Sequence, residues 1–168
     1  MSLSVRLKKT IFPTAIVIMA STPWAVQASP YIEGLIDQAA SPCLSLNGLL
    51  SEPDGETLMK NAVSMIDPCY QSLTALNDFE KSNPHITPFE KNYLNYKGGY
   101  VIWITSAAET IRNQTKVNGH ICRQVQVANL LWLKVDVPEE HPVKQEINNY
   151  PLRPMMISAC QKAFPPPS

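Results

Sequence analysis

The four cysteines of this sequence are the residues whose chemistry can be inferred most directly, and their even number favours oxidation to disulfides. They are Cys43, Cys69, Cys122 and Cys160, and no two of them form a Cys-x-x-Cys pair. An even number of cysteines in an oxidising compartment predicts two disulfides, for which three pairings are possible. We favour Cys43–Cys69 with Cys122–Cys160, because each bridge then stays within one half of the chain. A catalytic thiol is disfavoured, because it would leave an odd cysteine without a partner.

Metal binding has little support in the sequence. The three histidines, His85, His120 and His141, lie in separate polar stretches. A zinc site needs ligands at helical or knuckle spacing. Only His120 and Cys122 come close together, and Cys122 could not ligate a metal once it is oxidised. We therefore predict no metal site and no cofactor.

Acid–base chemistry has one candidate cluster, Glu139-Glu140-His141. Carboxylates and imidazoles are common general acids and bases, but adjacent acidic residues between Pro138 and Pro151 are more typical of a solvated surface. The chain contains no Gly-x-Ser-x-Gly motif, phosphate-binding loop or dinucleotide fingerprint. The sequence therefore predicts a binding protein rather than an enzyme, and it predicts no catalytic residue.

The N-terminal segment has the three parts of a secretory signal peptide. Three basic residues lie within positions 6–9, an apolar stretch runs from Ile11 to Ala20, and Val26-Gln27-Ala28 offers small residues for cleavage. The apolar stretch is shorter than the roughly 20 residues that span a bilayer, so we expect cleavage after Ala28. Residues 1–28 are thus predicted to direct the protein to the periplasm of a Gram-negative bacterium or out of the cell.

Removal of this segment leaves 140 of the 168 residues, which is the size of one domain. We expect a single helical domain over residues 29–164 and a disordered, proline-rich tail over residues 165–168. The signal peptide takes three of the fourteen basic residues and no acidic one, which leaves eleven lysines and arginines against fourteen aspartates and glutamates. This negative balance disfavours nucleic acid, or a membrane after signal cleavage, as the partner. We expect a protein partner.

The strongest helix start in the sequence is Thr87-Pro88-Phe89-Glu90. Threonine at the N-cap with glutamate three residues later is a capping box, and proline is tolerated at the first helical position. Apolar residues then recur every three or four positions, which predicts one amphipathic helix over residues 88–112. Gly98-Gly99 in its middle would be explained by a close helix–helix approach or a kink. The alternative is a β-hairpin that starts with the strand YVIWIT at residues 100–105.

Further apolar periods and prolines mark the remaining helices. We expect them at residues 31–40, at residues 55–66, from Pro68 onwards and at residues 121–135. Residues 139–149 form either a short helix or an exposed loop, and Pro151 or Pro154 opens the last helix. The sequence therefore predicts an all-α fold, a compact bundle of five or six helices stapled by two disulfides.

The predicted helix over residues 88–112 carries an aromatic face, which consists of Tyr93, Tyr96, Tyr100 and Trp103. Aromatic side chains at this spacing usually belong to the core or to a helix–helix interface, and we favour that interpretation. Tyrosine and tryptophan also anchor many protein–protein interfaces. The same face is therefore our candidate for the contact of a homodimer.

The C-terminal half resembles a known family in the order of its segments. A helix with the sequence YKGGYVIWITSAAETI is followed by a turn, by HICRQVQVANLLWLKVDVPEEHP and by a last helix that ends in ACQKAFP. This order is similar to that of the immunity proteins of type VI secretion amidase effectors, the Rap/Tai group, in which a Gly-Tyr helix precedes a cysteine. The chain departs from the family in having no cysteine directly ahead of that helix.

The resemblance implies a periplasmic, all-helical and often dimeric protein that blocks a peptidoglycan amidase by placing a loop in its active site. Our first candidate for that loop is the proline-bounded segment 139–149, with Glu139, Glu140 and His141 as binding residues. The second is the turn Asn118-Gly119-His120. Both segments could instead be ordinary solvated loops. A periplasmic chaperone, or an accessory component of a secretion or conjugation system, is the alternative function.

Overall fold

The computed structural model describes residues 30–50 and 55–165, and every regular element within them is an α-helix. The helices are α1 (Pro30–Leu50), α2 (Gly55–Ser82), α3 (Pro88–Arg112), α4 (Gly119–Leu133), α5 (Pro142–Asn149) and α6 (Leu152–Ala163). The all-α prediction is confirmed, and the hairpin alternative is wrong. The predicted signal peptide, and residues 166–168 of the predicted tail, lie outside the described residues.

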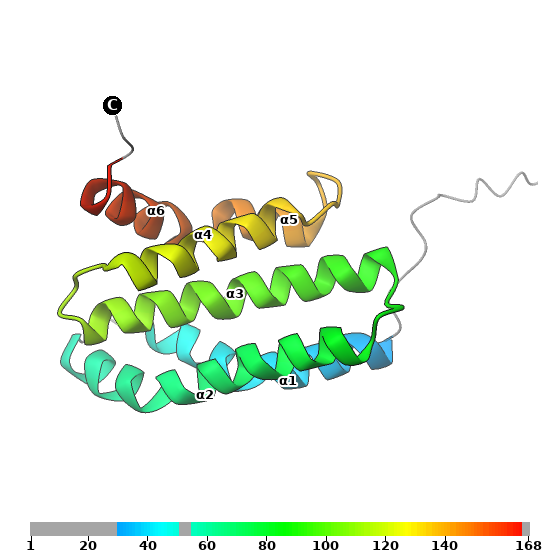
Figure 1. The fold of residues 1–168 in the computed structure, drawn as a ribbon, viewed down its shortest axis with the longest axis horizontal. Helices are drawn as coiled ribbons and strands as arrows, with labels where there is room; N and C mark the ends of the chain where they lie inside the picture. The colour runs from blue at the N-terminus through cyan, green and yellow to red at the C-terminus, as the bar shows by residue number, and fades with distance from the viewer. Residues whose placement is uncertain (1–29, 51–54, 166–168) are drawn as a thin grey trace, which may run out of the picture.

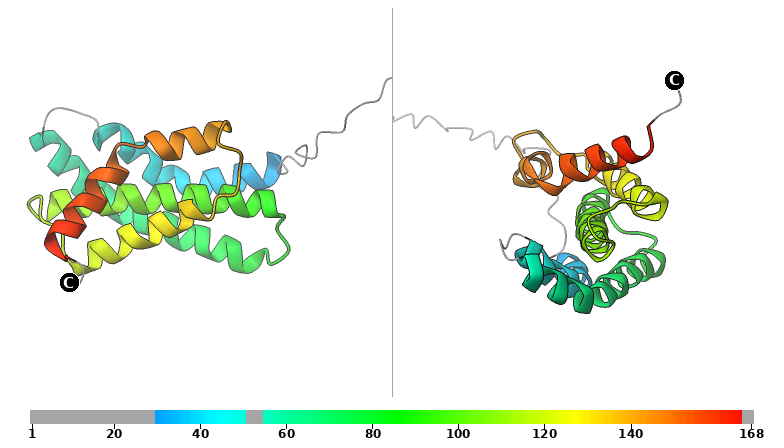
Figure 2. Two further views of the ribbon diagram at one scale, coloured as in Figure 1. Left: turned by 90° about the horizontal axis from the view of Figure 1, so that it is seen from above. Right: turned by 90° about the vertical axis from the view of Figure 1, so that its left-hand side faces the viewer.

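Helix α3 lies at the centre of the bundle. Helices α1 to α4 run antiparallel in succession, with α1 and α2 on one side of α3 and with α4, α5 and α6 on the other (Figure 1). The end-on view shows α3 between these two layers (Figure 2). The hydrophobic core accordingly has two parts, one between α3 and the α1–α2 pair and one between α3 and the α4–α6 layer. Both layers are therefore positioned by α3.

The N-terminus of α3 has the predicted capping box. Thr87 Oγ1 accepts a hydrogen bond from Glu90 N at 3.2 Å, and Glu90 Oε2 accepts one from Thr87 N at 2.7 Å. These bonds satisfy two backbone donors that the first helical turn cannot pair. The helix ends at Arg112. The predicted bounds of the longest apolar period are confirmed at both ends.

The two glycines of α3 have different surroundings. A Cβ atom on Gly99 would lie 2.4 Å from both Cδ1 and Nε1 of Trp132 in α4, whereas one on Gly98 would meet Leu131 Cδ1 at 3.5 Å. The indole N–H of Trp132 donates to the carbonyl oxygen of Tyr96 at 2.9 Å. Only a residue without a side chain allows this contact. The expected close approach between helices is therefore confirmed at Gly99.

Both favoured disulfides are present. Cys43–Cys69 joins α1 to α2, Cys122–Cys160 joins α4 to α6, and no cysteine is free. The bridges span 26 and 38 residues. Closing loops of such lengths stabilises the folded state by roughly 3 to 4 kcal/mol each in the chain-entropy account. Because structural disulfides persist in oxidising environments, the protein belongs to a compartment outside the reducing cytosol.

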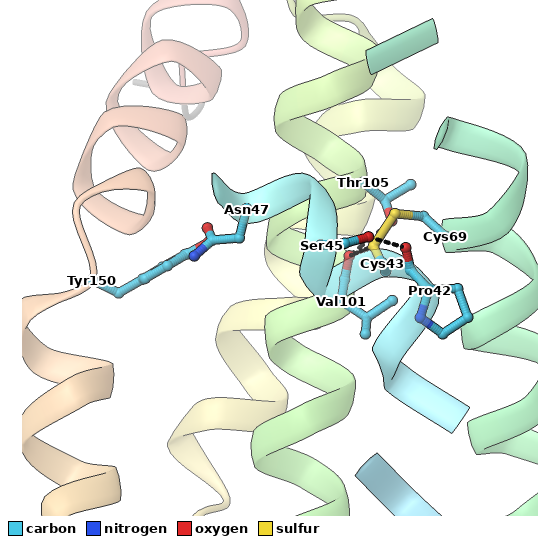
Figure 3. Close-up of a disulfide and its surroundings, with 8 residues drawn as sticks. All are labelled: Pro42, Cys43, Ser45, Asn47, Cys69, Val101, Thr105 and Tyr150. Carbon is cyan, nitrogen blue, oxygen red and sulfur yellow. Dashed lines mark hydrogen bonds between the residues drawn. A yellow bond between two sulfur atoms is a disulfide. The ribbon is translucent and has the colours of Figure 1, made fainter. Parts of the chain in front are cut away.

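The helix boundary predicted at Pro68 is wrong. Helix α2 continues through Pro68. Helix α1 likewise continues through Pro42 and ends at Leu50, ten residues beyond the predicted end at residue 40. Each proline directly precedes a cysteine of the Cys43–Cys69 bridge, and Figure 3 shows Pro42 beside that bridge. Proline inside a helix removes one hydrogen bond and costs about 3 kcal/mol. Local sequence rules predict an end at such a residue, but the cross-link and the burial of both cysteines stabilise the continuous helices.

A serine also offsets the proline in α1. Pro42 has no N–H group to donate to the carbonyl of Gln38, four residues earlier. The Ser41 hydroxyl donates to that carbonyl oxygen instead, at 3.2 Å. The hydrogen bond that the backbone loses is therefore replaced by a side chain.

We expect Thr87→Ala to lower the free energy of unfolding by about 1 kcal/mol, because it removes the acceptor for Glu90 N. Thr87→Ser should be nearly neutral, because serine supplies both the acceptor for Glu90 N and the hydroxyl donor to Glu90 Oε2. Chemical denaturation of the oxidised protein measures both values. Equal stability of Thr87→Ala and the wild type would contradict the capped helix start.

Candidate functional site

The turn Asn118-Gly119-His120 opens helix α4 beside the last turn of α3. Asn118 Oδ1 accepts hydrogen bonds from the backbone N–H groups of His120 and Ile121 at 3.0 and 2.9 Å. Asn118 is therefore the N-cap of α4, and Gly119 is its first residue. The His120 side chain is 58% exposed. The structure thus places all three predicted residues in one capped helix start.

A buried carboxylate, Glu109 of α3, lies next to this turn. Its side chain is 7% exposed. Tyr70 donates its hydroxyl hydrogen to Oε1, and Arg112 Nη2 lies 3.7 Å from the same oxygen. Glu109 Oε2 has no hydrogen-bond partner among the described residues, and His120 Nε2 lies 3.9 Å from it. The carboxylate is therefore satisfied on one oxygen only.

Gln124 connects the three helices around this carboxylate. Its Oε1 accepts from Ser106 Oγ at 3.2 Å, and its Nε2 lies 3.4 Å from the Tyr70 hydroxyl and 3.0 Å from His120 Nε2. Burial raises the pKa of Tyr70, and the hydrogen bond to Glu109 raises it further. The phenol therefore stays protonated at neutral pH and remains a donor to the carboxylate.

A polar pocket of about 170 Å³ opens beside Glu109. It is lined by Glu109, Arg112, Asn113, Asn118, His120 and Ile121. Four of these residues are exposed and polar, whereas Glu109 is buried. A pocket with a polar rim and one buried charge suits a small charged group better than an apolar ligand.

The other predicted binding residues are Glu139, Glu140 and His141. They form the turn between α4 and α5, where His141 N donates to the carbonyl oxygen of Pro138 at 3.0 Å. His141 Nδ1 accepts from Val143 N at 3.3 Å, which makes His141 the N-cap of α5. The segment 139–149 is thus a turn followed by a short helix, the first of the two expected forms.

Contacts on both sides hold this turn. Asn92 of α3 donates to the carbonyl oxygen of Asp136 at 2.9 Å and accepts from Asp136 N at 3.1 Å. On the other side, Asn148 Nδ2 donates to Glu139 Oε2 at 3.3 Å, and Lys144 Nζ lies 3.7 Å from Glu139 Oε1. The Glu139 side chain nevertheless remains 76% exposed. The turn therefore presents charge from a fixed backbone.

The two predicted turns do not form one site. They lie at opposite ends of α4, whose 15 residues span about 22 Å at the helical rise. In Figure 1 the α3–α4 connection and the α4–α5 connection lie at opposite ends of the molecule. Each turn is therefore a separate candidate surface.

The aromatic face of α3 lies largely inside the protein. Trp103 is fully buried and Tyr96 is 6% exposed, whereas Tyr93 and Tyr100 are partly buried. The ring of Trp103 lies 5.7 Å from that of Trp132, measured between centroids. The core interpretation explains these contacts, and the homodimer stays a prediction.

Hydroxyl groups around this face are tied to α1. Tyr93 donates to Asp37 Oδ1 at 2.8 Å, Asn47 Nδ2 donates to the Tyr100 hydroxyl at 3.1 Å, and Tyr150 donates to Asn47 Oδ1 at 3.0 Å. Figure 3 shows Asn47 facing Tyr150. Burial raises the pKa of Tyr93, and its bond to Asp37 adds to this effect. These tyrosines act as structural donors and acceptors.

Residues 30–50 and 55–165 contain neither a metal-binding cluster nor a membrane-spanning helix. No group of three or more His, Cys, Asp or Glu side chains there could hold a metal ion. No helix among the described residues is both long and apolar enough to cross a membrane.

Three residues of the Glu109 pocket region were not anticipated from the sequence. Glu109 belongs to an Ala-Ala-Glu stretch that is typical of any helix, and its partners Tyr70 and Gln124 lie 39 and 15 positions away. Only the packing of α2 and α4 on α3 brings them together. No local pattern could have identified them.

Comparison with known proteins gives no significant match to a protein-family model, to a curated protein or to a solved structure. The likeness of residues 96–165 to the amidase immunity proteins therefore stays a hypothesis.

We expect Tyr70→Phe to lower the free energy of unfolding by about 1 to 3 kcal/mol, because Glu109 would lose the hydroxyl donor to its Oε1. Tyr31→Phe is the matched control, since Tyr31 is 71% exposed. Urea denaturation at neutral pH compares the two variants. A Tyr70→Phe protein as stable as the control would mean that the Tyr70–Glu109 bond contributes nothing.

Proposed function

We propose that this protein is exported to the periplasm, where it inhibits a peptidoglycan amidase effector by occluding its active site. The observation that carries the proposal is the geometry of the turn Glu139-Glu140-His141. Its two carboxylates are exposed, while Asn92 and Lys144 hold it on either side. An exposed segment of fixed shape is what an inhibitor needs to enter an enzyme cleft.

Fixed shape favours binding because ordering a loop costs conformational entropy. A free loop loses that entropy on association, whereas a segment already held in its bound shape loses less. The Cys122–Cys160 bridge closes the chain around this turn, and Asn92 joins its start to the central helix. The affinity of such a turn should therefore depend mainly on its exposed side chains.

The chemistry of these side chains suits a cleft that binds a polar cell-wall peptide. Such a cleft must offer hydrogen-bond donors to its substrate, and Glu139 and Glu140 offer charged acceptors in return. The Nδ1 atom of His141 already accepts a bond from Val143 N. A neutral His141 ring therefore carries its proton on Nε2, which could donate to a catalytic residue of the amidase.

The compartment agrees with this function. The two disulfides place the protein in an oxidising environment, and a peptidoglycan amidase acts outside the cytosol. The resemblance of residues 96–165 to immunity proteins supports the same assignment.

One surface favours the alternative, a periplasmic chaperone or an accessory component of a secretion or conjugation system. Val127, Leu130 and Leu133 of α4 are 48%, 56% and 63% exposed. A pocket of about 200 Å³ beside α4 is lined in part by Leu73 and Leu131. Exposed apolar side chains of this kind mark surfaces that bind other proteins.

The test is protection of cells against a candidate amidase effector directed to the periplasm. We expect the wild type to prevent lysis and Glu139→Lys/Glu140→Lys/His141→Ala to fail. Reversing charges in a bound, desolvated turn should cost about 2 kcal/mol or more, which weakens binding roughly 30-fold or more.

The matched control is Asp67→Lys/Asp78→Lys, which reverses two exposed charges of α2 far along the chain from the turn. Full protection by the triple variant would exclude this turn as the inhibitory element. If the wild type protected cells against none of the amidase effectors encoded by neighbouring genes, the proposed amidase inhibition would be excluded.

A further inference from the structure

The pocket beside Asn118-Gly119-His120 contains a buried charge that the proposed inhibition does not use. The Glu109 side chain is only 7% exposed, yet its Oε2 atom has no hydrogen-bond partner among the described residues. Leaving a buried charged oxygen without a donor costs free energy. Glu109 lines the open pocket, although Oε2 itself has almost no accessible surface. A donor from the pocket therefore reaches Oε2 when the exposed His120 side chain, whose Nε2 lies 3.9 Å from it, turns away.

We infer that this pocket binds a primary alkylammonium group, with Glu109 Oε2 as its acceptor. The group would belong to a lysine side chain of a partner or to a small amine. The pocket volume of about 170 Å³ accommodates an ammonium with several methylene groups. This inference does not depend on the turn at Glu139.

The occupied oxygen of Glu109 selects between ammonium and guanidinium. Oε1 already accepts the Tyr70 hydroxyl and faces Arg112. A guanidinium is recognised best by two carboxylate oxygens at once, and here one of the two acceptor positions of Oε1 is taken by Tyr70, whereas Oε2 accepts no bond from the described residues. An ammonium needs one strong acceptor, and its other N–H groups can stay hydrated because Asn113 and Asn118 at the rim are exposed.

Other ligand classes fit less well. An anion would be repelled by Glu109, and the backbone donors at the start of α4 are already taken by Asn118 Oδ1. A metal ion would find two ligands, Glu109 and His120, beside the positive charge of Arg112. The residues that line the pocket therefore favour a cation that can donate hydrogen bonds.

Two resident groups compete with the ligand. Arg112 Nη2 lies 3.7 Å from Oε1 and His120 Nε2 lies 3.9 Å from Oε2. Both side chains are more than half exposed, at 51% and 58%, so solvent screens their interaction with the carboxylate. Neither occupies Oε2 at hydrogen-bond distance. Removal of the Arg112 charge should therefore strengthen ammonium binding.

The test is a titration of the ¹⁵N-labelled, oxidised protein with n-butylammonium chloride, followed by backbone amide chemical shifts at constant ionic strength. We expect saturable shifts around residues 109–121, and affinity at least about tenfold higher than for Glu109→Gln. Asp78→Asn is the matched control, since Asp78 also has a basic partner three residues on, Lys81, but is exposed. Its affinity should equal that of the wild type.

Parallel titrations separate the possible ligands. Tetramethylammonium has the charge but no N–H donor and should not bind, and n-butylguanidinium should bind more weakly than n-butylammonium. A capped Gly-Lys-Gly peptide that binds more tightly than n-butylammonium would assign the site to lysine side chains, and the reverse order would assign it to small amines.

Arg112→Gln gives a second test that does not alter the buried carboxylate. It should bind n-butylammonium roughly twofold or more tighter than the wild type. Equal affinity of wild type and Glu109→Gln, equal binding of tetramethylammonium, or tighter binding of the guanidinium would each overturn the inference.

Discussion

The contact between Gly99 of α3 and the indole of Trp132 of α4 sets the geometry on which the candidate sites depend. A Cβ atom at residue 99 would lie 2.4 Å from two atoms of the ring, so the helices can approach this closely only because glycine is present. The indole N–H is bonded to the backbone of α3 at Tyr96, which also fixes the rotation of α4 about its axis. Because protein interiors are close-packed, α4 cannot slide or turn gradually against α3 without displacing buried side chains.

The Gly99–Trp132 contact therefore determines where both ends of α4 lie. At the start of α4, Gln124 and His120 come to lie beside Glu109, and the Cys122–Cys160 bridge ties the same turn to α6. Beyond the end of α4, the bonds of Asn92 to Asp136 hold the chain against α3 before the acidic turn. One helix thus presents two separate polar surfaces, one with a buried charge and one with exposed charges.

Local signals in the sequence predicted the parts of the structure that local interactions determine. The capping box at Thr87, the apolar period to Arg112 and the pairing of the cysteines within each half are examples. The helix end predicted at Pro68 is wrong because the rule that proline ends a helix holds for isolated helices and takes no account of the disulfide at the next residue. Glu109 was missed for the same kind of reason, since its partners come from α2 and α4 and become neighbours only after folding.

The Gly99–Trp132 contact is tested most directly by the stabilities of Gly98→Ala and Gly99→Ala, measured by chemical denaturation of the oxidised proteins. Alanine at residue 98 meets only ordinary contact, so its higher helix propensity should raise the free energy of unfolding by up to about 1 kcal/mol. Alanine at residue 99 should lower it by about 1 to 3 kcal/mol, because the buried indole must shift. Stabilisation by Gly99→Ala equal to that by Gly98→Ala would contradict the account.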